Sequence, residues 1–209
     1  MTRMGYITDL PLFLASTALI SVPLVVSPGP VFAVTVAKGA QNKMAGALIA
    51  LGHGAVEFPL ILLLYLGLSE LIKNSIVHKV IGIIGGLIMI YLGFQILKSR
   101  KEAAYAHSRS ERSSFVAGLV ATGANPYFFI SWATIGAVLV ENAAIFGLFG
   151  ILLFSVVHWL IDLVWDSLVS LTVFKSRRFW TPKVFSTIFV FCFIILVSFG
   201  LWFIIISFF

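Results

Sequence analysis

The sequence predicts an all-α membrane protein whose six transmembrane helices form two inverted three-helix repeats. Three observations predict this architecture: an apolar composition, six apolar runs of membrane-spanning length, and polar motifs that recur in both halves of the chain. Of the 209 residues, 60% are hydrophobic and only 11% are charged, and the mean hydropathy is +1.09. A soluble domain carries about a quarter charged residues. The composition therefore excludes an ordinary soluble protein.

The apolar runs predict helical spans over residues 10–37, 46–69, 80–97, 114–140, 144–174 and 184–208. A helix needs about 20 apolar residues to cross a hydrocarbon core of about 30 Å. No room remains for a second domain, so residues 1–209 are expected to form one transmembrane domain, with repeat 1 over about 10–97 and repeat 2 over about 114–208. The first run is longer than the core of a cleavable signal peptide, about 7–15 residues, and we expect it to be retained.

The basic residues predict the orientation of the chain in the cell membrane. Eleven of the 14 Lys and Arg residues lie in the first, third and fifth loops, and three lie on the opposite side. Cytoplasmic loops carry an excess of Lys and Arg, so we expect both termini to lie outside the cytoplasm. Basic residues confined to short loops favour contact with the lipid bilayer over nucleic-acid binding. The single cysteine, Cys192, lies inside an apolar run and excludes an intramolecular disulfide.

Proline motifs interrupt the first and fourth predicted spans. Ser27-Pro28-Gly29-Pro30 lies within the first, and Asn125-Pro126 lies within the fourth. Proline removes a backbone donor and clashes with the preceding turn, so both helices should break or kink there. Broken backbone survives at membrane depth only where protein or a water-filled cavity satisfies the freed groups. Matched breaks in two halves of opposite orientation are typical of inverted-repeat transporters with a site at the midplane.

Each half also carries a His-x-x-x-acid pair in its second span. The pairs are His53 with Glu57 and His158 with Asp162, and Asp166 follows one turn later. Residues four apart share one helix face, so the pairs should point into the bundle and converge on one cavity. Ionisable groups inside a membrane are costly and usually functional. They predict a proton or ion relay, with a purely structural role for the acids as the alternative. No Lys or Arg balances them within the spans, which favours a cation-friendly cavity.

The breaks themselves are the predicted substrate site. A half-helix that begins after Pro-Gly-Pro presents unpaired N–H groups and a positive dipole end, which attract an anionic group such as a carboxylate. A structural kink that only lets helices pack is the alternative. The predicted substrate-binding residues are Pro28, Gly29, Pro30, Asn125 and Pro126.

Several segments resemble the lysine-exporter (LysE/RhtB) family of amino-acid exporters. They are the Pro-Gly-Pro motif, Lys38-Gly39, Lys43-Met44-Ala45-Gly46, Tyr91 to Lys98 and Asn125-Pro126. The resemblance covers most of the chain to about residue 135. It implies export of amino acids or related small molecules, driven by the proton gradient, without a resident cofactor. The family often has Lys after Asn-Pro, whereas this chain has Tyr127.

Other functions stay open or are disfavoured by the residues present. His53, Glu57, His158 and Asp162 could also form a transient site for a divalent metal, which makes a metal cation exporter the alternative. Neither a His-Glu-x-x-His zinc motif nor a Gly-x-Ser-x-Gly nucleophile motif occurs, so we expect no enzyme. Small residues in the second and third spans suit close helix packing within the bundle or between subunits, which leaves a homodimer open.

Overall fold

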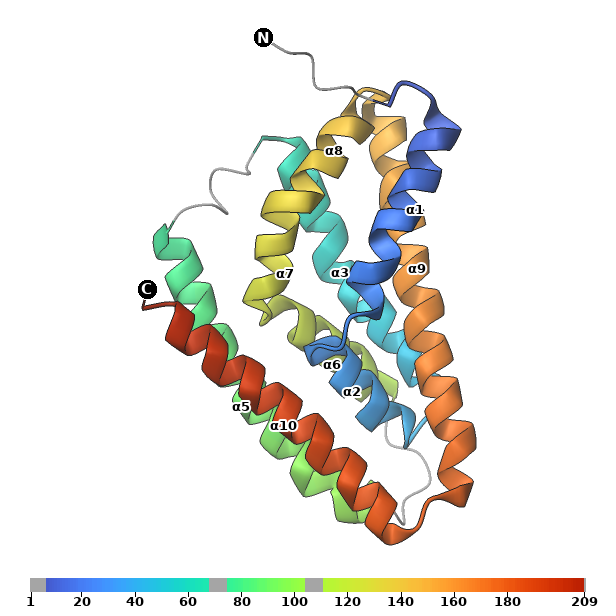
Figure 1. Ribbon diagram of the computed structural model, residues 1–209, viewed down its shortest axis with the longest axis vertical. Coiled ribbons are helices and arrows are strands. Elements are labelled where there is room, and N and C mark those ends of the chain that lie inside the picture. Colours follow the sequence, from blue (N-terminus) through green and yellow to red (C-terminus); the bar gives the residue numbers. More distant parts are fainter. Residues whose placement is uncertain (1–6, 68–74, 104–110, 209) are drawn as a thin grey trace.

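The computed structural model describes residues 7–67, 75–103 and 111–208, and over these residues the chain is helical (Figure 1). Among them, five helices are long and apolar enough to cross a membrane, and a bent pair provides a sixth crossing if it is counted as one span. This confirms the expected all-α membrane protein, and the five to six candidate spans include the six that the sequence predicts.

The first span is broken at the predicted place. Helix α1 (Leu10–Val26) begins after Asp9, whose side chain accepts a hydrogen bond from the N–H of Leu12 at 2.8 Å. It stops before the Pro-Gly-Pro motif, and α2 (Pro30–Gly39) starts at the second proline of that motif, at an angle of 70° to α1. Proline suits the first helical position, where its missing N–H costs nothing. The motif therefore ends one helix and begins the next.

The fourth span is broken too, but its boundaries differ from the prediction. Helix α6 (Glu111–Gly123) ends before Asn125, which caps α7 (Pro126–Ser131) by accepting a bond from the N–H of Tyr127 at 3.1 Å. The chain continues through a π-helical turn, Trp132–Gly136, into α8 (Ala137–Ala144). Residues 126–144 are long enough to cross a membrane by themselves, and 114–123 form a shorter apolar helix.

The predicted fourth span ends at residue 140, before Glu141 and Asn142; this boundary is also wrong, because both residues lie within α8. The side-chain amide of Asn142 donates a hydrogen bond to the carbonyl of Val138 at 2.8 Å, and this bond accommodates a polar residue near the end of the helix. The chain turns only after Ala144, where Gly147 has a φ of 64°. Glycine adopts this left-handed conformation at little cost.

The other helices are α3 (Ala45–Tyr65), α5 (Ser75–Ala103), α9 (Gly147–Ser176) and α10 (Pro182–Ile206). Helices α3 and α9 pack on one another, α6 packs on α3, and α1 packs on α9. Helices α5 and α10 run side by side along one edge of the molecule and contact the remainder mainly through α2 (Figure 1).

Glycines allow these helices to approach closely within the bundle. A Cβ on Gly52 of α3 would collide with the carbonyl oxygen of Phe115 in α6. Between α5 and α10, a Cβ on Gly86 would lie 2.5 Å from the carbonyl oxygen of Gly200, and a Cβ on Gly200 would lie 2.7 Å from that of Gly86. Small residues at such crossings are usual in membrane bundles.

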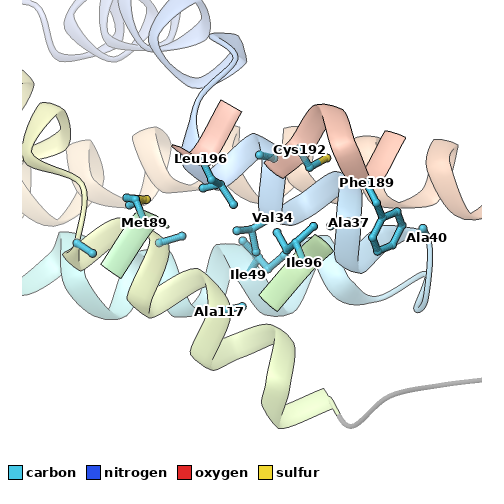
Figure 2. Close-up of a cluster of buried hydrophobic side chains, with 13 residues drawn as sticks. Val34, Ala37, Ala40, Ile49, Met89, Ile96, Ala117, Phe189, Cys192 and Leu196 are labelled. Atoms are coloured by element: carbon cyan, nitrogen blue, oxygen red, sulfur yellow. The ribbon is translucent and has the colours of Figure 1, made fainter. Parts of the chain in front are cut away.

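Helix α2 lies inside the protein despite its short length. Its buried residues Val34 and Ala37, with Ala40 directly after the helix, pack in a cluster with Ile49, Met89, Ala117 and Leu196, which come from α3, α5, α6 and α10 (Figure 2). Cys192 belongs to the same buried cluster. The broken half-helix is therefore packed among other helices of the bundle.

Candidate functional site

A cavity of about 480 Å³ lies where the two broken spans meet α3 and α9. We call it the central cavity. This volume is typical of small-molecule sites, which range over about 300–1,000 Å³. Its lining includes both proline breaks and every ionisable residue singled out in the sequence: Pro28, Gly29, Pro30, Asn125, His53, Glu57, His158, Asp162 and Asp166. Pro126 does not belong to this lining; it is buried and faces Gly85 of α5.

Four of the ionisable residues form one buried group, which we call the acid–imidazole cluster: His53, Glu57, His158 and Asp162. Oε1 of Glu57 lies 3.1 Å from Nε2 of His53 and 3.3 Å from Nε2 of His158. Asp162 is more loosely placed, with oxygens 4.0 Å and 3.9 Å from the same two nitrogens. Glu57 is fully buried, with 0% exposure. One carboxylate oxygen therefore joins the histidines of both halves of the chain.

The outer nitrogen of each histidine contacts a hydroxyl from the broken helix of the other half. Nδ1 of His53 lies 2.8 Å from Oγ1 of Thr122 in α6. Nδ1 of His158 lies 2.7 Å from Oγ of Ser21 in α1. The sequence reasoning missed both hydroxyls. The available signal was a polar side chain within an otherwise apolar run, and many such residues only bond their own helix.

The Ser21 hydroxyl lies between two partners. Its Oγ is 2.7 Å from the carbonyl oxygen of Thr17 and 2.7 Å from Nδ1 of His158. A serine hydroxyl has one hydrogen to donate, so the direction of the His158 contact depends on the tautomer of His158. The contact between Nε2 of His158 and Oε1 of Glu57 also needs a proton, because two bare acceptors at 3.3 Å would repel. A proton is therefore held between the two halves at this contact.

Asp166 lines the central cavity but takes a different partner. Its Oδ1 accepts a hydrogen bond from Thr35 of α2 at 3.1 Å, and the residue is only 4% exposed. The structure thus divides the predicted stripe on α9: His158 and Asp162 face Glu57 and His53, whereas Asp166 ties α9 to the half-helix α2.

The N-terminus of α2 opens into the same cavity. Gly29 precedes it with an extended backbone, and no side chain caps the helix. By their position, the N–H groups of Val31 and Phe32 have no acceptor within the helix. A Cβ added to Gly29 would meet no atom within 4 Å. Gly29, Val31 and Phe32 all line the central cavity, so space for part of a ligand lies beside this helix start.

The cavity wall is acidic and keeps unused hydrogen-bonding atoms. Its lining, among the described residues, contains three carboxylates and no Lys or Arg. Oε2 of Glu57, Oδ2 of Asp162 and Nε1 of Trp165 are buried without a hydrogen-bond partner. His53, Glu57 and Asp162 also offer ligand atoms within 4.8 Å of one another, a spacing at which they could hold a metal ion.

A family model described as "LysE type translocator" matches residues 22–207. The chain belongs to the LysE type translocator family. This confirms the resemblance read from the proline motifs. As a member of this family, the chain is a multi-pass membrane transporter of small molecules and not an enzyme.

A Bacillus subtilis (strain 168) protein named "Putative amino acid efflux protein YcgF" is 27% identical over 161 residues, which cover 74% of this chain and 77% of that protein. No solved structure gives a significant match.

Proposed function

We propose that this LysE family member exports amino acids or related small molecules across the cell membrane and couples export to the proton gradient. The observation that carries the proposal is that one cavity contains both the uncapped N-terminus of α2 and the acid–imidazole cluster. The name of the Bacillus subtilis relative points to the same class of substrate.

The substrate carboxylate is proposed to bind at the proline breaks. The N–H groups that follow Pro30 carry the positive end of the α2 dipole, which favours an anionic group by roughly 0.3–1 kcal/mol or more in a buried setting. The open space at Gly29 leaves room for that group. Pro28, Asn125 and Pro126 would hold the two broken backbones in place around it.

The acid–imidazole cluster is proposed to carry the coupling protons. Glu57, His53, His158 and Asp162 are buried beside the substrate space, and Oε1 of Glu57 lies 3.3 Å from Nε2 of His158 across the two halves, where a shared proton would sit. A small relative movement of the halves would break this contact and release that proton. Asp166, bonded to Thr35, would connect the movement of α2 to α9.

We propose that residues 1–209 form one transporter domain with repeat 1 over about 10–97 and repeat 2 over about 114–208. The reciprocal contacts support this division: α6 packs on α3 as α1 packs on α9, and Thr122 contacts His53 as Ser21 contacts His158. With the basic loops facing the cytoplasm, both termini would lie outside.

Helix α2 is proposed to close the path from the cytoplasm. A second cavity of about 300 Å³ lies between α2, α5 and α6 and is lined by Val34, Ala37 and Lys38, among others. The first turn of α2 lines the central cavity instead. Movement of this short helix would therefore connect the two spaces, and the break at Gly29 would act as its hinge.

Transport by purified protein in liposomes tests the proposal. Liposomes loaded with one unlabelled amino acid at a time should accumulate the labelled form by counterflow at equal pH on both sides. An imposed pH gradient should then drive net transport of the same compound, and a protonophore should abolish it. Absence of counterflow for every amino acid would contradict the substrate assignment. Counterflow without any response to the pH gradient would contradict the coupling alone.

A divalent metal cation exporter is the second candidate function. It is favoured by the ligand atoms of His53, Glu57 and Asp162, which lie within 4.8 Å of one another. Nε2 of His158 lies 3.3 Å from the Glu57 carboxylate and could add a fourth ligand. Imidazole and carboxylate ligands suit several divalent metals. Uptake of manganese, zinc or cobalt into the same liposomes, with no amino acid counterflow, would favour this candidate.

A further inference from the structure

We propose that the indole N–H of Trp165 binds the carboxylate of the transported amino acid, so that Trp165 selects substrates with a free carboxylate. The inference rests on the proposed amino acid export and adds a residue that neither the sequence motifs nor the family assignment indicates. Trp165 lies on α9 and lines the central cavity.

The two tryptophans of α9 that follow Phe154 differ in their hydrogen bonding. Nε1 of Trp159 donates to the carbonyl of Ala50 in α3 at 2.8 Å. Nε1 of Trp165 is buried and has no hydrogen-bond partner. A buried indole N–H usually finds a partner, and leaving one unpaired costs about 1–3 kcal/mol. The fold satisfies one indole and leaves the other, on a residue that lines the cavity, without a partner from the chain.

The nature of the missing group follows from a second unpaired atom nearby in the chain. Asp162 lines the same cavity three residues before Trp165, is 8% exposed, and has an Oδ2 atom without a hydrogen-bond donor. Oε2 of Glu57 is likewise buried without a hydrogen-bond donor. The cavity thus combines an unused donor with unused acceptors, which do not bond one another. A ligand that carries both an anionic acceptor and a cationic donor satisfies both kinds of atom.

An α-amino acid zwitterion is such a ligand. Its carboxylate would accept from the Trp165 indole and from the N–H groups at the start of α2, and its ammonium group would donate to the Asp162 and Glu57 oxygens. Aromatic side chains in the same lining, Phe128, Trp132 and Phe199, would surround an apolar substrate side chain. An amide or a decarboxylated amine lacks the charged acceptor and should bind less well.

The test compares Trp165→Phe with Trp159→Phe in full-length protein reconstituted in liposomes. Phenylalanine keeps an aromatic ring and removes only the N–H. For an amino acid that wild-type protein exchanges by counterflow, Trp165→Phe should raise KM about tenfold or more, the loss expected for a hydrogen bond to a charged group. The maximal rate should change little. Wild-type protein should prefer the amino acid over its amide, and Trp165→Phe should lose most of that preference.

Thermal unfolding in detergent separates binding from a structural role. Trp165→Phe removes an unpaired polar group and should leave the melting temperature equal or higher, whereas Trp159→Phe loses the bond to Ala50 and should lower it without changing KM. An unchanged KM and an unchanged acid-to-amide preference in Trp165→Phe would overturn the inference while leaving amino acid export intact. Wild-type protein that exchanges no amino acid would overturn the proposed function, and the inference with it.

Discussion

Glu57 and His158 come from opposite halves of the chain, yet Oε1 of Glu57 lies 3.3 Å from Nε2 of His158. The same oxygen lies 3.1 Å from His53, the histidine of its own helix. Asp162 holds the corresponding position in the second half, but its oxygens stay 3.9 Å and 4.0 Å from the two histidines. The two pairs look equivalent in sequence and are unequal in space, because Glu57 is one methylene longer and bridges both imidazoles.

This bridge predicts that Glu57→Gln abolishes gradient-driven export. Glutamine keeps the shape of the side chain but loses the charge that holds the proton between the halves. Asp162→Asn should have the same effect, because it removes the second carboxylate of the cluster. Net transport under an imposed pH gradient should fall to the rate of protein-free liposomes. Counterflow at equal pH should persist with a raised KM, because the neutral amide oxygens of Gln and Asn accept more weakly from the substrate ammonium group than the carboxylates do.

Glu141→Gln is the matched control for the loss of a carboxylate, because Glu141 is exposed on α8, outside the cavity lining. It should pump at the wild-type rate. If Glu57→Gln and Asp162→Asn also pump normally at every pH, both acids are structural and the relay is wrong.

The hydroxyl contacts of the histidines predict a shift in the pH dependence of export. In Ser21→Ala, Nδ1 of His158 loses its hydroxyl hydrogen-bond partner, a contact worth about 1 kcal/mol. The pH at which export reaches its maximum should therefore shift, with the protein still folded. The measurement is the initial rate of net transport as a function of pH.

Thr122→Val removes the hydroxyl that contacts His53 and should also change the pH profile. Thr187→Val is its control, because Thr187 is exposed and donates only to the carbonyl of Lys183 in its own helix at 3.0 Å. Identical pH profiles for wild-type protein, Ser21→Ala and Thr122→Val would show that these hydroxyls have a structural role and no part in proton coupling.

Two glycine substitutions should distinguish a glycine that leaves room for substrate, Gly29, from a glycine that only lets two helices pack, Gly52. Gly29→Ala adds a methyl group where no protein atom lies within 4 Å, so it should fold normally and raise the KM for substrate. Gly52→Ala forces a methyl group against the carbonyl of Phe115 and should destabilise the bundle by about 1–3 kcal/mol. Melting temperature and counterflow KM are the measurements. A Gly29→Ala protein with wild-type KM would contradict a substrate site at the break.

The basic residues predict the orientation of the chain, which cysteine labelling in intact cells can test. Cys192 is buried and should not react. Ser108→Cys lies in the segment 98–112 that we expect in the cytoplasm, although residue 108 is outside the described part of the structure. Ile145→Cys lies in the exposed turn before α9 and should react from the outside. Labelling of Ser108→Cys from the outside alone would reverse the proposed topology.

The sequence predicted those features that depend on local chemistry. Hydropathy indicated the spans, because crossing a bilayer needs a continuous apolar run. Pro28, Pro30 and Pro126 indicated the helix breaks, because proline removes a backbone donor and crowds the preceding turn. Proline alone does not decide a break, since Pro23 and Pro59 lie inside α1 and α3. It misjudged the end of the fourth span, since Glu141 and Asn142 looked like a loop and Asn142 instead bonds the helix carbonyl of Val138.

The tertiary structure alone decided how the polar residues pair. Ser21 and His158 are separated by 137 residues, and His53 and Thr122 by 69, so no helical period could connect them. For the same reason the sequence did not indicate that Glu57 bridges both histidines or that the Trp165 indole lacks a partner. The sequence by itself determined a membrane transporter with broken helices and buried charges, because composition and proline act locally. The partners of those charges depend on the packing of helices from both halves around one cavity.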